Sequence, residues 1–286
     1  MRAFAELVMR CRMHAIIIIV LMMAAPMLFW LGAAAASLVL MRRGPQQAAQ
    51  VVLWGALPGV VWASVGDPRA LAVYAISLLM AYVLRQTVSL GAALGAGLVA
   101  GTVGAVLLAG VYPEPIEQLA AKLSEFMPQM LGGMYEQLSA TEQQHLTSLI
   151  IPVLTGLFAT VMLWVSVLSL TLARYWQAAL YNPGGFAAEF RSFRLSPKFA
   201  IPLVLVMFFA PNLGVAAAML TPLCSVPLAF AGVALIHGWV AKRGLSKFAL
   251  VMFYIVLFLF MQFVYPLLVI LALGDSLFDF RRVRSR

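Results

Sequence analysis

The chain has 286 residues, of which 64% are hydrophobic and only 10% are charged, and its mean hydropathy is +0.99. Soluble domains contain about 45–50% apolar and about 25% charged residues. The composition therefore excludes a cytosolic enzyme, a disordered regulator and a nucleic-acid-binding domain as the main body. The net charge of +9 comes from short basic clusters beside apolar runs, which is typical of membrane-protein loops that contact anionic lipid headgroups. The sequence predicts an all-α, polytopic transmembrane helix bundle, with residues 1–286 as a single integral membrane domain.

Seven apolar runs follow one another along the chain, and a membrane-spanning helix needs about 20 such residues. The runs cover residues 15–41, 51–65, 70–84, 88–111, 149–173, 199–240 and 248–273. The first is broken near Pro26 and forms either one tilted span or two short helices; because it continues to Met41, we interpret it as an uncleaved segment rather than a secretory signal. The run at 199–240 is too long for one span and is expected to turn near 211–214 or near 221–227. About eight spans are predicted.

The loops divide into basic ones and one acidic one, and this division predicts the topology. Basic residues occur at Arg42–Arg43, at Arg85, in 174–198 and in 242–247. We expect these loops on the cytoplasmic side of a bacterial inner membrane. If the last apolar run made a single crossing, the basic cluster at 281–286 would fall on the opposite side. Either that run re-enters near Pro266, or the charge rule fails at this point.

The acidic loop, residues 112–148, is expected outside the cytoplasm because it carries five glutamates against one lysine. Its apolar residues recur at three- and four-residue steps, which indicates a helix, and Gly132-Gly133 interrupts this pattern. Ser139 and Glu142 have the spacing of a capping box at the start of the next helix. We predict an extra-cytoplasmic amphipathic helical insertion that either packs as a surface helix or covers a cavity as a lid.

The segment 174–197 is predicted to be a cytoplasmic interfacial loop followed by a short helix. Asn182-Pro183 is suited to a helix cap, and the two glycines that follow allow a sharp bend. Phe186, Phe190 and Phe193 share one helical face, which is typical of a helix that lies in the membrane interface with arginines at the phosphates. The segment is either a connector that anchors the bundle or a docking element for a cytoplasmic protein partner or a lipid headgroup. The candidate docking residues are Arg174, Trp176, Asn182, Gly184, Gly185, Phe186, Arg191 and Arg194.

A stripe of glycines marks the run at 88–111. Gly91 and Gly95 form one small-xxx-small pair, and Gly97 and Gly101 form another. Such pairs let helix backbones approach closely in lipid, where packing replaces the hydrophobic driving force. The stripe is expected either to pack inside the protein or to dock a second membrane protein.

Candidate ligand-binding residues are polar but uncharged, because no Asp, Glu, Lys or Arg lies deep inside an apolar run. That pattern disfavours a proton pump or a carboxylate-coupled antiporter. The motifs HExxH, GxSxG and GxxxxGK[ST] are missing, so we expect no enzyme, no metal site and no cofactor. Proline-broken membrane helices free backbone groups that line substrate cavities. Polar residues in such regions, and one tryptophan, are the candidates: Asn212, Ser225, Gln262 and Trp164.

The stretch ARYWQAALYNPGGFAAEFRSFRLSP at 173–197 resembles the YybS-like family of uncharacterised bacterial membrane proteins. The flanking stretches VLRQTVSL at 83–90, ALIHGWVAKRGLS at 234–246 and GDSLFDFRR at 274–282 are similar in order. This resemblance implies no catalytic residues. At the level of the fold, the chain also looks distantly like the substrate-binding membrane subunits of energy-coupling-factor vitamin transporters.

Two functions are compatible with these features. The first is a small-molecule binding or transport subunit that lacks its own ATPase. The second is a membrane scaffold or assembly partner that docks other proteins through the segment 174–197 and the glycine-rich helix.

Overall fold

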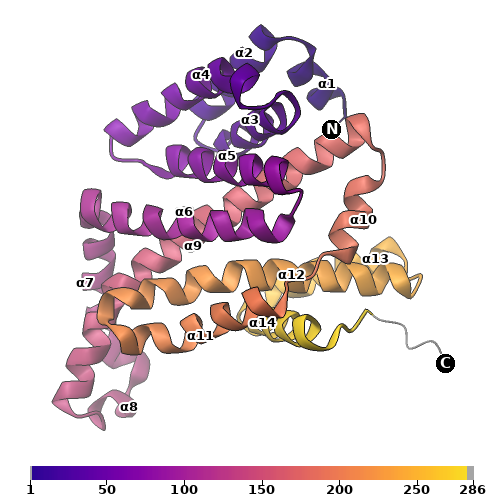
Figure 1. The fold of residues 1–286 in the computed structure, drawn as a ribbon. Coiled ribbons are helices and arrows are strands. Elements are labelled where there is room, and N and C mark those ends of the chain that lie inside the picture. The colour runs from indigo at the N-terminus through magenta and orange to yellow at the C-terminus, as the bar shows by residue number, and fades with distance from the viewer. Residues whose placement is uncertain (1, 282–286) are drawn as a thin grey trace.

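The computed structural model describes residues 2–281, and every regular element in that part of the chain is helical (Figure 1). The prediction of an all-α protein is therefore confirmed for the described residues. Among them, five helices are long and apolar enough to cross a membrane, or up to seven if each of two bent helix pairs is one span. The chain is accordingly a multi-pass membrane protein.

The helices follow one another with short connections. In chain order they are α1 (Arg2–Arg10), α2 (Arg12–Ala24), α3 (Phe29–Arg43), α4 (Pro45–Ser64), α5 (Arg69–Thr87), α6 (Leu90–Val111), α7 (Pro113–Leu131), α8 (Gly133–Glu136), α9 (Ala140–Tyr181), α10 (Gly185–Ser192), α11 (Pro197–Leu213), the 3-10 helix η1 (Val215–Met219), α12 (Leu220–Lys242), α13 (Lys247–Leu259) and α14 (Met261–Phe278).

The first apolar run folds as two short helices rather than one tilted span. Pro26 lies in the turn between α2 and α3, which pack against each other. The indole of Trp62 on α4 donates to the carbonyl of Ala24 at 3.2 Å, so the end of α2 lies beside the end of α4. The run from Gly32 to Met41 on α3 is entirely buried, because its small side chains let α2, α4, α5 and α9 approach closely.

The long run at 199–240 breaks at Gly214, the first of the two positions that the sequence allowed. Gly214 has a φ of +148°, which glycine adopts without the steric cost that a Cβ would bring. Helix α11 ends just before it, and η1 leads into α12. Helices α10 and α11 meet at 61°, and α1 meets α2 at 120°, so each pair changes direction sharply within a few residues.

Most of the basic residues lie at one end of the bundle, and we call it the basic end. There Arg85 of α5 donates to the carbonyl of Met41, and Arg43 donates to the carbonyl of Met9 at 2.9 Å. Lys242 at the end of α12 donates to the carbonyl of Arg281 at 3.1 Å. Figure 1 shows α1 and α10 near this end, and α7 and α8 at the opposite one.

The last two helices form a hairpin whose ends both lie at the basic end. Helix α13 begins five residues after Lys242, and the break before α14 falls at Phe260 rather than at Pro266. After α14 the chain returns to Lys242 through Arg281. The last run therefore turns back, so the basic residues at both of its ends do not conflict. Residues 282–286 of the terminal basic cluster lie outside the described residues.

The predicted insertion forms α7 and α8 at the end opposite the basic end. Gly132, at a φ of +53°, separates the two helices as expected. Ser139 and Glu142 form the predicted capping box at the start of α9. Helix α7 packs on α9, with Ile116 and Ala120 buried. More distal apolar side chains of the insertion are exposed, among them Phe126, Met130 and Met134.

Candidate functional site

A cavity of about 640 Å³ lies between α9, α10, α12, α13 and α14; we call it the aromatic cavity. Small-molecule sites are typically hollows of about 300–1,000 Å³ with apolar walls and a few polar groups. Phe, Tyr and Trp side chains dominate the walls, with aliphatic residues and a few polar groups between them. The lining residues are Trp164, Leu168, Thr171, Phe186, Ala187, Phe190, Arg191, Ala229, Phe230, Val233, His237, Tyr254, Leu257, Phe258, Met261, Tyr265 and Leu268.

The aromatic cavity opens sideways on the surface of the bundle. Phe258 of α13 is 84% exposed and Leu168 of α9 is 54% exposed, and both line it. An apolar neighbour of about 530 Å³ lies between α9, α11, α12 and α14. Tyr265 lines both cavities. A molecule in the aromatic cavity would therefore be held by the bundle on one side and would face the surrounding lipid on the other.

A chain of hydrogen bonds fixes the wall that the two cavities share. Trp164 Nε1 donates to the Tyr265 hydroxyl at 3.2 Å, and the Tyr265 hydroxyl lies 2.7 Å from Ser225 Oγ. Ser225 Oγ in turn donates to the carbonyl of Pro222 at 2.6 Å. Each hydroxyl thus has one donating and one accepting partner when Tyr265 donates to Ser225. The chain ties α9, α12 and α14 together in an apolar interior, where an unpaired polar group is costly.

A second polar pair lies nearer the basic end. His237 Nε2 and the Tyr254 hydroxyl are 2.8 Å apart and join α12 to α13. The ring of Phe190 on α10 packs edge-on against His237, with a centroid distance of 5.1 Å. Arg191 follows Phe190 and also lines the cavity. The aromatic cavity therefore has polar groups in two places: at Trp164 and Tyr265, and nearer the basic end at His237, Tyr254 and Arg191.

The structure brings together two of the four ligand-binding residues that the sequence predicted. Trp164 and Ser225 meet through Tyr265, although they are 61 residues apart in the chain. Asn212 lies exposed near the end of α11, and Gln262 lies exposed near the start of α14. Neither of these two side chains lines the aromatic cavity or its neighbour.

The predicted interfacial helix is α10, and its phenylalanines face the bundle rather than the acyl chains. Phe190 and Phe193 pack edge-on against Phe230 of α12, at centroid distances of 5.3 and 5.7 Å. Phe186 stacks on Phe190 at 5.8 Å and lines the aromatic cavity. The sequence places Phe186, Phe190 and Phe193 on one helical face, but it does not tell whether this face meets lipid or a neighbouring helix.

Other predicted docking residues also make internal contacts. Trp176 is 1% exposed and packs on Phe4 of α1 at a centroid distance of 5.1 Å, so it is not an interface aromatic. Arg174 pairs with Glu189 at 2.6 Å.

The bend between α9 and α10 depends on its two glycines. Gly184 has a φ of +86°, in the left-handed region that glycine adopts readily. A Cβ at Gly185 would lie 2.3 Å from Nδ2 of Asn182. Both glycines therefore shape the turn that carries α10 back onto α12.

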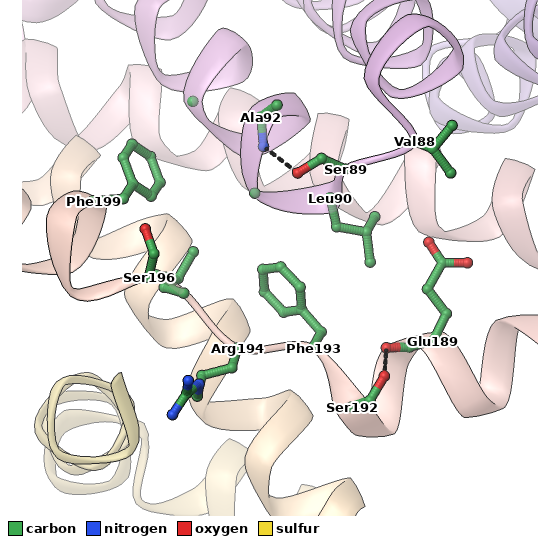
Figure 2. Close-up of a pocket in the computed structure, with 13 residues that line it drawn as sticks. Val88, Ser89, Leu90, Ala92, Glu189, Ser192, Phe193, Arg194, Ser196 and Phe199 are labelled. Atoms are coloured by element: carbon green, nitrogen blue, oxygen red, sulfur yellow. Dashed lines mark hydrogen bonds between the residues drawn. The ribbon is translucent and has the colours of Figure 1, made fainter. Parts of the chain in front are cut away.

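The glycine stripe divides between the interior and a hollow. A Cβ at Gly97 would lie 2.7 Å from Sδ of Met80, and one at Gly101 would lie 3.3 Å from Leu223. These two glycines therefore pack inside the protein. Gly91 and Gly95 instead line a hollow of about 560 Å³ at the basic end, between the start of α6 and the link from α10 to α11 (Figure 2).

The charged groups that line this hollow are engaged elsewhere. Figure 2 shows the Phe193 ring directed into the hollow and the Arg194 side chain directed away from it, toward α14. Arg194 pairs with Asp279 at 3.3 Å, and Glu189 pairs with Arg174. The hollow is therefore a weaker candidate for a binding site than the aromatic cavity.

Sequence reasoning missed the tyrosines that organise the aromatic cavity. Tyr254 and Tyr265 lie in the last apolar run at positions that carry no local motif, and their partners are on other helices. A tyrosine within an apolar run is a usable signal, because its hydroxyl needs a partner when it is buried.

The comparisons with known proteins found no family model, no curated protein and no solved structure that matches this chain. The resemblance to the YybS-like family therefore stays a prediction. Among residues 2–281, no group of three or more His, Cys, Asp or Glu side chains is arranged to hold a metal ion. The site is thus defined by its shape and by the polar groups in its walls.

Proposed function

We propose that the protein binds an apolar or amphipathic small molecule in the aromatic cavity. The observation that carries the proposal is a hollow of about 640 Å³ with aromatic walls, a few polar groups and a sideways opening. Aromatic side chains offer large apolar contact areas with few rotatable bonds. The ligand enters from the bilayer through the opening between Leu168 and Phe258, and it leaves by the same route.

The arrangement of charges supports a place in a bacterial inner membrane with the basic end in the cytoplasm. On this reading α2 to α6, α9, α11 and α12 make eight crossings. The pair α13–α14 is a hairpin that returns to the cytoplasmic side, and α7 and α8 are extra-cytoplasmic. Pro222 lies in the first turn of α12 and Pro227 lies inside this helix, both near the polar chain, and neither can donate a backbone hydrogen bond.

Binding is better supported than docking of other proteins through 174–197. The scaffold function requires available side chains, whereas Trp176 and Phe190 are used in internal contacts. Gly97 and Gly101 also face other helices of this chain. A role as the binding subunit of a transporter that takes its energy from another protein is the extension of this proposal.

A matched pair of tryptophan substitutions tests the proposal. Val233→Trp adds bulk inside the aromatic cavity, whereas Val251→Trp adds the same side chain on α13 at a position that is 52% exposed and lines neither cavity. The probe is dioleoylglycerol, counted by native mass spectrometry of the full chain released from micelles. We expect Val233→Trp to weaken retention of one lipid molecule about tenfold, equivalent to about 1.4 kcal/mol.

The control variant Val251→Trp should retain the probe as the unmodified protein does. Equal retention by Val233→Trp and the unmodified protein would overturn the proposal, because the cavity would then play no part in binding. Size-exclusion profiles of both variants check that each remains a single folded species.

A further inference from the structure

A second hollow, which we call the basic hollow, lies beside the aromatic cavity at the basic end. It has a volume of about 470 Å³ and is formed by the end of α10, the end of α12 and the chain after α14. Four of its lining residues are cationic: Arg191, Arg194, Lys242 and Arg281. A concentration of cationic donors in a concave site is the usual chemistry of phosphate recognition.

The cations of the basic hollow exceed the carboxylates beside them. Asp279 pairs with Arg194 at 3.3 Å, and Asp275, which is buried, pairs with Arg281 at 3.2 Å. Within residues 2–281, no carboxylate forms an ion pair with Arg191 or Lys242. Among the residues that the structure describes, the buried Nε of Arg281 also has no hydrogen-bond acceptor. The hollow therefore has more cationic donors than acceptors, which is the condition for binding an anion.

Arg191 connects the two cavities, because it lines both of them. On its one side lie Phe190 and His237 of the aromatic cavity. On its other side lie Gly238 and Lys242 of the basic hollow. An anionic group and an apolar chain that are covalently linked could therefore occupy both hollows with Arg191 between them.

We infer that the ligand of the aromatic cavity is an anionic amphiphile, a lipid with a phosphate headgroup. This inference rests on the proposed function and adds the chemical class of the ligand. The phosphate binds in the basic hollow to Arg191 and Lys242, and the hydrocarbon chain occupies the aromatic cavity. The sideways opening at Phe258 lets the remaining chain length stay in the bilayer.

The position of the basic hollow also fits a lipid rather than a soluble anion. The hollow lies at the end of the bundle where phosphates of the inner leaflet are expected under the proposed topology. The aromatic cavity beside it would have no role in binding a free anion. The two hollows together separate charge from hydrocarbon in the same order as a phospholipid does.

The test compares two lipids with the same chains. Dioleoylphosphatidic acid and dioleoylglycerol differ only in the phosphate, and inorganic phosphate serves as the soluble anion. Binding to the full chain in neutral detergent is measured by native mass spectrometry and by the shift in melting temperature. We expect phosphatidic acid to bind about tenfold more tightly than dioleoylglycerol, and inorganic phosphate at equal concentration to give no shift.

A charge-matched pair of double variants locates the phosphate. Arg191→Gln with Lys242→Gln removes two exposed cations from the basic hollow, and Arg243→Gln with Lys247→Gln removes two exposed cations that line neither cavity. The first pair should abolish the preference for phosphatidic acid, and the second should keep it. Arg281 donates a hydrogen bond to the backbone carbonyl of Arg191 at 2.7 Å, so substitution of the Arg191 side chain leaves this contact in place.

Several outcomes separate this inference from the proposed function. Equal binding of the two lipids would overturn the inference and leave the proposed function standing. Equal loss of preference in both double variants would overturn it as well, because the effect would then be one of net charge. A full shift with inorganic phosphate alone would overturn the lipid as the source of the anion. If neither lipid binds, both the inference and the proposed function fail.

Discussion

Helices α3 and α13 are both short and apolar, yet they take opposite places in the molecule. In α3, ten consecutive residues from Gly32 to Met41 are buried. In α13, no residue is buried, although nearly all are large and apolar. The difference lies in side-chain size: alanines let four helices close around α3, whereas large side chains of α13, Tyr254 and Phe258 among them, line a cavity. In a lipid-soluble chain, small residues therefore indicate the packed interior better than hydrophobicity does.

The two regions also differ in what holds them. The N-terminal helices are held by close packing of small side chains. The C-terminal helices are held at the basic end by ion pairs among Arg194, Asp275, Asp279 and Arg281, and further inside by the hydrogen bonds of Tyr265. Changes of charge should therefore affect the second region more, and changes of volume should affect the first.

The largest effect is expected at Asp275. This residue is 2% exposed, pairs with Arg281 and accepts a hydrogen bond from the backbone of Phe280 at 3.0 Å. Asp275→Asn leaves a buried guanidinium without its counter-charge and should lower the free energy of unfolding by about 3 kcal/mol. Denaturant titration in mixed micelles measures this change in the free energy of unfolding. The exposed pair of Arg2 and Glu6 is the control, and Glu6→Gln should cost less than about 0.5 kcal/mol.

An added volume in α3 should have the next largest effect. Ala35 is fully buried, so Ala35→Leu overpacks the centre of the N-terminal helices and should cost about 2 kcal/mol of unfolding free energy. Val251→Leu, at an exposed position of α13, should change it by less than about 0.5 kcal/mol. The same titration measures both variants. Similar costs at the two positions would show that side-chain size does not distinguish the regions.

Removal of one hydroxyl probes the polar chain of the C-terminal region. Tyr265→Phe deletes the hydrogen bonds to Trp164 and Ser225 and should lower the unfolding free energy by about 1 kcal/mol. Tyr175→Phe removes a hydroxyl from a side chain that is 45% exposed and should be nearly neutral. Equal melting temperatures for the two variants would mean that the chain of hydrogen bonds contributes nothing to stability.

The smallest effect concerns the turn between α4 and α5. Hydrogen bonds from Arg69, at 2.7 and 2.6 Å, hold the pKa of the Asp67 carboxyl below its usual range. Because this pKa is depressed in the folded state, the pair stabilises the protein above the unfolded-state pKa of about 4 and loses that contribution as the pH falls further. The pair is largely exposed, so the contribution is below about 0.5 kcal/mol. The stability difference between Asp67→Asn and the unmodified protein should therefore vanish at low pH.

Local features of the fold were predictable, and contacts between distant helices were not. Pro26, Gly132 and Gly214 mark chain breaks, and Ser139 with Glu142 marks a helix start, because each acts within a few residues. The direction of the α10 phenylalanines depends on Phe230, forty residues later. Of the candidate site, Trp164 and Ser225 stood out by residue type, but Tyr265, which joins them, is recognisable only once α14 is placed against α12.

Helix α9 is the longest helix among residues 2–281. Its 42 residues extend about 63 Å at 1.5 Å each, roughly twice the thickness of a hydrocarbon core. This helix contacts η1 through Gly156, Tyr265 in the wall of the aromatic cavity through Trp164, and the N-terminal helix α1 through Trp176. Pro152 is the proline inside it, and it lies on the acidic side of the cavity, where it cannot donate a backbone hydrogen bond to the helix. One unbroken helix therefore connects the end of the molecule that carries α7 and α8 with the cavity wall and with α1.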